Sequence, residues 1–205
     1  MAILYGNLID ATLKLIDEYS RKGTEVPTAK TADYRLKIPE AINAIQQDLA
    51  YGPGRLIAEI TISNSAATQE EEYEPLPTDW FRVMKVMQRR NNRHWVPFYD
   101  YRINSNDFVY SARESGDILI TYFRRPTAVT VGNPVSPTAA ELVQPIDVVP
   151  EAEFIIPLGV AGMILAGDDN NQSTHFLNLY ESRKYMLPQP EDNFIPYTIP
   201  NITGW

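Results

Sequence analysis

The feature that most constrains this chain is the apolar run "FIIPLGVAGMILAG", which extends from Phe154 to Gly167. A helix that spans a membrane needs about 20 mostly apolar residues to cross roughly 30 Å of hydrocarbon. This run is shorter, Glu151 and Glu153 lie at its start, and "DDNN" follows it. The run is therefore predicted to form a helix buried in protein, with no membrane-spanning segment. Other helices must then pack around it.

The N-terminal part of the sequence supplies such helices. Between Leu4 and Tyr19 apolar residues recur every three or four positions, and Gly23 is suited to end this helix. A second helical pattern occupies "DYRLKIPEAINAIQQDLA" and stops at "YGPG". Because proline fits the first turn of a helix, the regular part of this helix is predicted to begin near Pro39, and any helical residues before it are expected to be kinked or to form a separate turn. The N-terminus lacks a basic region before its apolar residues, so it is not expected to be a signal peptide.

Another helical pattern follows the apolar run in "DDNNQSTHFLNLYESRKYML", which opens with residues that cap helices. Two arrangements are open for this segment. It can continue the apolar helix across a break, or it can fold back on that helix. Within the run, Pro157 must lie in the first turn of the helix or cause a kink.

The period of the sequence changes from 3.6 to 2 between about Arg55 and Ile146. The stretch "RLIAEITIS" alternates, and "GDILITYFRRP" is rich in β-branched and aromatic residues. Short strand-like runs lie between them, so an antiparallel sheet or small sandwich is predicted between two helical parts. In "PLPTDW", Thr78 or Asp79 is placed to cap a single helical turn before a strand.

These patterns together predict an α+β fold. It consists of a helical bundle of about four helices, an inserted antiparallel β-sheet or sandwich domain, and an extended C-terminal tail. The predicted boundaries are residues 1–54 for the N-terminal helices, 55–147 for the inserted domain, 148–187 for the C-terminal helices and 188–205 for the tail.

The tail "PQPEDNFIPYTIPNITGW" contains several prolines, which exclude a helix, and more apolar residues than an ordinary disordered tail. The spacing of two between Ile195, Tyr197 and Ile199 places them on one face of an extended strand. The tail is therefore predicted to dock on a partner or on a neighbouring subunit. The alternative is that it packs on its own subunit. The predicted docking residues are Phe194, Ile195, Tyr197, Ile199 and Trp205.

Catalytic and metal-binding patterns are missing from the sequence. It has no cysteine, and its two histidines, His94 and His175, are predicted to be surface or packing residues. No nucleophile elbow, phosphate-binding loop or dinucleotide-binding loop is present. The acidic runs "QEEEYE" and "GDDNN" are interpreted as a solvated turn and a helix cap. We therefore expect no enzymatic activity, no cofactor and no metal site. The net charge of −8 gives no indication of nucleic-acid binding.

The order of these phrases resembles the head-to-tail adaptor, or connector, proteins of tailed bacteriophages. The resemblance rests on "LPTDWFRV" (residues 76–83), "GDILITYFRRP" (116–126), "EAEFIIPLGVAGMIL" (151–165) and "LNLYESRKYML" (177–187). It covers nearly the whole chain, but its elements are patterns and not invariant catalytic residues. Pro157 departs from the family pattern.

The resemblance implies a structural protein of the virion neck, assembled in the host cytoplasm. Such adaptors form a dodecameric ring beneath the portal protein, extend the DNA channel, and provide a platform for the tail or the next neck protein. Genomic DNA passes through the channel without specific binding, which suits a negative net charge. The tail segment of such proteins commonly reaches the portal.

Two other classes of function are open at this point. One is a tail-completion or tail-terminator protein of the virion. The other is a carbohydrate-binding β-domain on a helical stalk, which requires a concave site built from Trp80, Trp95, Tyr99 and Tyr101.

Overall fold

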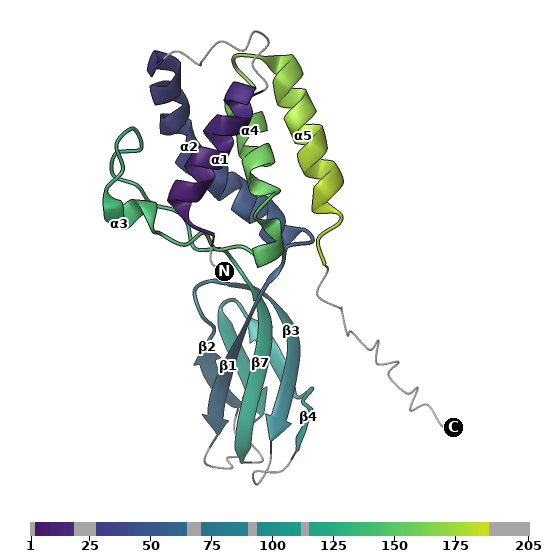
Figure 1. Ribbon diagram of the computed structural model, residues 1–205. Helices are drawn as coiled ribbons and strands as arrows, with labels where there is room; N and C mark the ends of the chain where they lie inside the picture. Colours follow the sequence, from purple (N-terminus) through teal and green to yellow (C-terminus); the bar gives the residue numbers. More distant parts are fainter. Residues whose placement is uncertain (1–2, 19–27, 65–70, 90–93, 112–114, 189–205) are drawn as a thin grey trace. The chain divides into compact units, whose positions relative to one another are not determined.

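The computed structural model describes residues 3–18, 28–64, 71–89, 94–111 and 115–188 (Figure 1). These residues form two compact units. A helical unit comprises residues 3–56 and 125–188, and a β unit comprises residues 57–124. The predicted α+β class is confirmed, with helices from both ends of the sequence in one unit and strands in the other.

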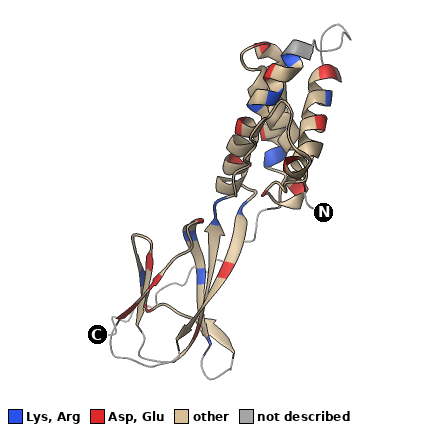
Figure 2. Cartoon of the chain, turned by 90° about the vertical axis from the view of Figure 1, so that its left-hand side faces the viewer, with Lys and Arg blue, Asp and Glu red and all other residues tan. Residues whose placement is uncertain are grey.

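Helix α4 is the centre of the helical unit. Nine of its ten residues are buried, and it packs against α1, α2 and α5 (Figure 1). It contains no charged residue, whereas charged residues of both signs lie along the other long helices (Figure 2). The prediction of a buried helix within the apolar run is confirmed. The helices are α1 (Tyr5–Glu18), α2 (Thr28–Tyr51), the short α3 (Ala139–Leu142), α4 (Ile156–Leu165) and α5 (Asn170–Lys184).

Two glycines allow α4 to approach its neighbours closely. A Cβ atom added at Gly159 would lie 2.6 Å from Cδ1 of Ile45 in α2 and 3.0 Å from a ring carbon of Tyr180 in α5. One added at Gly162 would lie 2.7 Å from Cγ of Leu177. Pro157 lies in the first turn of α4, where the missing N–H has no helical partner to lose. The prediction that Pro157 lies in the first turn of the helix is therefore confirmed, and its alternative, a kink within the helix, is not needed.

Helix α5 folds back on α4 instead of continuing it. Asp169 is the N-cap, and its Oδ1 accepts hydrogen bonds from the backbone N–H groups of Asn171 and Gln172, both at 3.1 Å. These bonds satisfy two of the four donors that an α-helix leaves unpaired at its start. The hydroxyl of Ser173, one turn into α5, donates to the Gly162 carbonyl at 2.7 Å and joins the two helices.

A polar cluster joins α5 to α2. The Lys184 ammonium donates to Oδ2 of Asp48 at 2.8 Å and to Oε1 of Glu181 at 3.2 Å, and the Tyr180 hydroxyl also donates to Asp48. Lys184 is only 8% exposed, so its charge requires these partners. Burial opposes the charged form of Lys184, but the hydrogen bonds to Asp48 and Glu181 outweigh it and raise the lysine pKa.

The second helix differs from the prediction. Helix α2 is continuous from Thr28 to Tyr51 and contains Pro39 near its middle, so it does not begin near that proline. Pro39 has no N–H to donate to the carbonyl of Arg35, four residues earlier. Packing of Tyr34, Ile38 and Ile42 into the core on both sides of the proline stabilises the continuous helix.

The β unit contains two antiparallel sheets. The first has the strand order β1-β7-β3-β4 and the second has the order β2-β6-β5. Strand β7 returns antiparallel to β3, with Val86 opposite Ile120 and Gln88 opposite Ile118. The strands are β1 (Leu56–Asn64), β2 (Glu71–Pro75), β3 (Trp80–Arg89), β4 (Trp95–Pro97), β5 (Tyr101–Asn104), β6 (Asp107–Ser111) and β7 (Gly116–Arg124).

The two sheets share one core, so the β unit is a small sandwich. Ile118 and Ile120 of β7 belong to the same buried cluster as Phe108 and Tyr110 of β6. The Phe108 ring is fully buried and stacks on Tyr101 with ring centroids 5.1 Å apart. Burial raises the pKa of Tyr101, as expected for a phenol within an apolar core.

The boundary predicted at residue 147 differs from the structure, because residues 125–147 belong to the helical unit. The Asn43 side chain of α2 holds Val129 through two hydrogen bonds, one from the Val129 N–H at 2.7 Å and one to its carbonyl at 3.0 Å. The side-chain amide of Gln46 donates to the carbonyls of Thr127 and Asp147, both at 3.4 Å. The inserted unit therefore ends at Arg124, earlier than the proline-marked stretch suggested.

Candidate interaction surfaces

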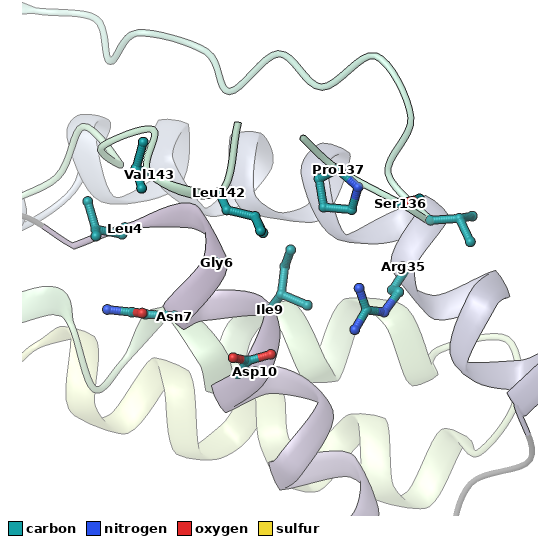
Figure 3. A pocket seen from close by; sticks show the side chains of 11 residues that line it. Leu4, Gly6, Asn7, Ile9, Asp10, Arg35, Ser136, Pro137, Leu142 and Val143 are labelled. Atoms are coloured by element: carbon teal, nitrogen blue, oxygen red, sulfur yellow. The ribbon is translucent and has the colours of Figure 1, made fainter. Parts of the chain in front are cut away.

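A groove opens on the helical unit between α1, α2 and the segment around α3, with a volume of about 500 Å³ (Figure 3). Leu4, Ile9 and Leu142 supply apolar lining, and Asp10 and Arg35 lie beside Ile9. The volume is within the range of sites that bind small molecules or peptide side chains. A mixed lining of this kind suits non-covalent recognition.

Backbone bonds fix one wall of the groove to α1. The Tyr5 N–H donates to the Gln144 carbonyl at 2.9 Å, and the Ile146 N–H donates to the Ile3 carbonyl at 2.7 Å. A Cβ atom added at Gly6 would lie 3.1 Å from the Leu142 carbonyl oxygen, so the two segments are in close contact there. This wall is therefore part of the rigid packing of the helical unit.

The Glu141 carboxylate holds the segment around α3, which also forms part of this wall, in place. It accepts hydrogen bonds from the backbone N–H groups of Gly132 and Thr138, both at 2.6 Å, and from the Thr138 hydroxyl at 2.8 Å. These bonds lower the pKa of Glu141. Thr138 and Glu141 form a capping box at the start of α3. This role was not predicted, although "TAAE" at residues 138–141 carries the capping-box signature.

A second surface lies at the end of the helical unit where α2 and α5 end and α4 begins (Figure 1). Phe154 is 76% exposed, Tyr185 is 71% exposed and Met186 is 79% exposed. Single exposed apolar residues are common on proteins, but several large ones at one end of a unit indicate a contact surface. The predicted docking tail starts from this end, directly after Leu187.

The four aromatic residues proposed for a carbohydrate site are not brought together. Trp80 opposes Arg124 at the start of β3, whereas Trp95 opposes Arg89 at the end of that strand. At about 3.3 Å per residue, the two ends of this ten-residue strand are roughly 30 Å apart. Tyr101 packs in the sandwich core, while Tyr99 is 62% exposed. The concave site that this hypothesis requires is therefore absent from the described residues.

The acidic runs have structural roles. Glu71 forms a two-point ion pair with Arg102, with oxygen–nitrogen distances of 2.7 and 2.6 Å. Glu72 accepts a hydrogen bond from Tyr110 at 2.9 Å, and Asp169 caps α5. The interpretation of "GDDNN" as a helix cap is confirmed, whereas the described part of "QEEEYE" is strand β2 and not a turn.

Neither histidine takes part in a cluster of possible metal ligands. His94 precedes β4, and His175 lies on α5 with its ring 5.8 Å from that of Phe176. Among the described residues, no group of three His, Asp or Glu side chains is arranged to hold a metal ion. The same residues include no helix that is both long enough and apolar enough to cross a bilayer.

The predicted docking residues Phe194, Ile195, Tyr197, Ile199 and Trp205 lie outside the described residues. Their role therefore stays a prediction.

Two of the phrases that carry the family resemblance, residues 76–83 and 116–126, meet in the structure, because the Tyr122 hydroxyl of β7 donates to Oδ1 of Asp79 at 3.4 Å. Asp79 lies in a turn closed by the Trp80 N–H and the Pro77 carbonyl, and it does not cap a helical turn as predicted.

In comparisons with known proteins, no family model matches the chain, and no curated protein matches it significantly.

Proposed function

We propose that this chain is a structural virion protein of a tailed bacteriophage, a head-to-tail adaptor. In this role, copies of the chain form a ring beneath the portal, extend the DNA channel, and provide the attachment platform for the tail or the next neck protein. The ring is dodecameric, as the resemblance implies. The chain acts without enzymatic activity and without a cofactor.

The observation that carries the proposal is the match between the order of the sequence phrases and the elements of the fold. Residues 76–83 lead into β3, and residues 116–126 form β7 and return the chain to the helical unit. Residues 151–165 contain α4, and residues 177–187 form the second half of α5 and the turn after it. The phrase at residues 116–126 therefore crosses the end of the β unit, the phrases at 151–165 and 177–187 lie in the helical unit, and the phrase at 76–83 lies within the β unit.

The described surfaces support a role in assembly. The groove lined by α1, Arg35 and the α3 segment is a recess suited to a neighbouring subunit, and the exposed Phe154, Tyr185 and Met186 provide apolar contact area. Copies that contact each other head to tail use two different patches, and such contacts close into a ring when the rotation between copies is suitable.

The proposal is tested by mixing the purified chain with portal-containing particles from the same genome. We expect the full chain to join the particles, and a chain truncated after Leu187 to lose this binding while its helical circular dichroism and melting temperature stay unchanged.

A matched pair of tail variants separates the apolar residues from tail length. In one variant, serine replaces the five predicted docking residues, and in the other it replaces Gln189, Glu191, Asp192, Asn193 and Asn201. The first should lose binding and the second should keep most of it. A full chain that fails to join particles that other neck proteins join would contradict the proposal, and binding to tail tubes instead would favour the tail-terminator class.

A further inference from the structure

The edge strands of the β unit differ in how they are protected from pairing with another chain. Strand β4 has three residues and ends at Pro97, and β2 has five residues, ends at Pro75 and contains three glutamates. Strand β5 has four residues and carries the Arg102 ion pair. Short length, charge and proline are the features that prevent an edge strand from accepting a further strand.

Strand β1 has none of these protections. It is nine residues long, contains no proline or lysine, and its single charged residue is Glu59, which accepts a hydrogen bond from Thr121 at 3.2 Å. Within the part of the chain that the structure describes, β1 has a neighbouring strand, β7, on one edge only. Its outer edge is therefore the edge best suited to accept an extended segment.

The sequence of the tail provides a segment with one edge able to pair. Its prolines are Pro188, Pro190, Pro196 and Pro200, all at even positions. In an extended chain, alternate residues direct their N–H and C=O groups to opposite edges. The prolines therefore remove donors from one edge only, whereas the odd-numbered residues from 193 to 201 keep every N–H on the other edge. Such a segment can add to a sheet but cannot readily accept another strand itself.

The starting point of the tail decides which copy supplies the segment. Gly54, two residues before β1, contacts Leu187 at the end of the helical unit, since a Cβ atom there would lie 3.6 Å from Cδ1 of Leu187. A tail that pairs with β1 of its own chain thus leaves from the start of β1 and runs parallel to it. Antiparallel pairing is somewhat more stable per residue and needs a tail from another copy. The six residues from Leu187 to Asn193 reach about 20 Å when fully extended, so the pairing requires a neighbouring copy that presents the end of its β1 within that distance.

We infer that residues 193–201 of one copy add antiparallel to the outer edge of β1 in a neighbouring copy. The odd-numbered residues Ile195, Tyr197 and Ile199 make the backbone bonds. This inference rests on the proposed ring, because it requires neighbouring copies, and it assigns the receiving edge of the tail within that ring.

Disulfide formation between single cysteines tests the pairing, because the full chain contains no cysteine of its own. Full chains with Ser63→Cys, near the end of β1, are mixed with tagged full chains with Asn193→Cys. Antiparallel pairing brings residue 193 near the end of β1, so a mixed dimer should form on oxidation. Ile57→Cys, at the start of β1, should give little dimer with the same tagged chain. Dimer formation through Ile57→Cys instead, or no mixed dimer at high protein concentration, would overturn the inference.

Two proline substitutions at adjacent positions test whether only one edge of the tail segment pairs with β1. In the Asn193→Cys chain, Ile199→Pro removes an N–H from the pairing edge and should lower the dimer yield about tenfold, whereas the adjacent Thr198→Pro should leave it nearly unchanged. Ile199→Ala controls for the lost side chain. Equal effects of the two prolines would overturn the inference. If chains with Ser63→Cys and Asn193→Cys join portal particles but form no disulfide between positions 63 and 193, this pairing is wrong and the proposed function stays intact.

Discussion

The two units of this protein are built from the sequence in opposite ways. The β unit is one continuous segment, residues 57–124, whereas the helical unit joins residues 3–56 to residues 125–188 across that insertion. The helical unit is held together by an apolar core around α4, with close backbone approach at Gly159 and the Asp48–Lys184 cluster as additional contacts. The β unit is held together by a core of aliphatic and aromatic side chains, and among the described residues its long strand β1 has a neighbouring strand on one edge only.

The two units can therefore serve different purposes in the proposed assembly. A helical body whose halves are far apart in sequence must be complete before α4 is covered, so it is suited to be a rigid part of a ring. A β unit that is continuous in sequence can fold from local contacts and present its edge to a neighbour. Substitutions in each unit can show whether the two units are stabilised separately and by the contacts described above.

The largest expected effect is on the β unit. Replacing Phe108 with alanine removes a fully buried ring that stacks on Tyr101 and lies 5.7 Å from the ring of Tyr110. We expect the free energy of unfolding of the β unit to fall by about 3–5 kcal/mol. Hydrogen exchange should show faster exchange of β6 and β7 amides with α4 amides unchanged. Equal acceleration in both units would show that they unfold as one.

A smaller effect is expected from Gly159→Ala in the helical unit. The new methyl group would lie 2.6 Å from Ile45 Cδ1 and 3.0 Å from the Tyr180 ring, so these side chains, or the helices that carry them, must shift away from α4. Overpacking of this kind should cost about 1–3 kcal/mol of helical-unit stability, measured by chemical denaturation. Gly167→Ala is the matched control, because a Cβ atom there meets nothing within 4 Å. A Gly159→Ala variant as stable as this control would refute the close packing.

The polar cluster gives a weaker effect with a defined pH dependence. Asp48→Asn weakens the partner of the buried Lys184 and should cost about 1 kcal/mol, since Glu181 remains and Asp48 is partly exposed. The raised pKa values of Lys184 and Tyr180 mean that the cluster stabilises the folded state at neutral pH.

That contribution is lost as the pH rises through the folded-state pKa values of the lysine and the tyrosine. The contribution is fully present up to about pH 10, near the ordinary pKa values of tyrosine and lysine. Above that pH, thermal unfolding should show a steeper loss of helical-unit stability in the original chain than in Asp48→Asn. Parallel pH profiles for the two proteins would show that Asp48 is not responsible.

The smallest effect is expected at the groove wall. Glu141→Gln removes the charge that accepts two backbone hydrogen bonds, so the amides of Gly132 and Thr138 should exchange faster while the core stays unchanged. Because the Glu141 pKa is lowered, its contribution is present at neutral pH and is lost as the pH falls through the folded-state value. After correction for the intrinsic pH dependence of amide exchange, acidification of the original chain should lower the protection of the Gly132 and Thr138 amides to the level seen in the variant. Protection of these two amides that does not change with pH would count against this role.

Much of this fold follows from periodicity. The uniform apolarity of α4, the alternation in β1 and the capping residue Asp169 each indicate their element locally, and the structure confirms them. The continuity of α2 across Pro39 could not be predicted, because packing of distant residues outweighs the local cost of the proline. The boundary at Arg124 was missed because Asn43, far away in sequence, holds Val129.

The groove was beyond sequence reasoning for the same reason. Arg35 and Leu142 come from opposite sides of the insertion, and only the packing of the helical unit places them around one recess. The Thr138–Glu141 capping box is different, because its signal is local and could have been recognised. The apolar docking residues of the tail can be predicted from the sequence alone. The surface that they bind cannot, because it depends on which other chain lies next to the tail in the assembly.

Electron microscopy of the purified chain mixed with the portal protein of the same genome is the most direct test of the proposed adaptor function. We expect closed rings of the chain, coaxial with the portal and bound to one end of it, with density for the tail between neighbouring subunits. Portal particles without an added ring, at concentrations where other neck proteins bind, would contradict the assignment of this chain as a head-to-tail adaptor.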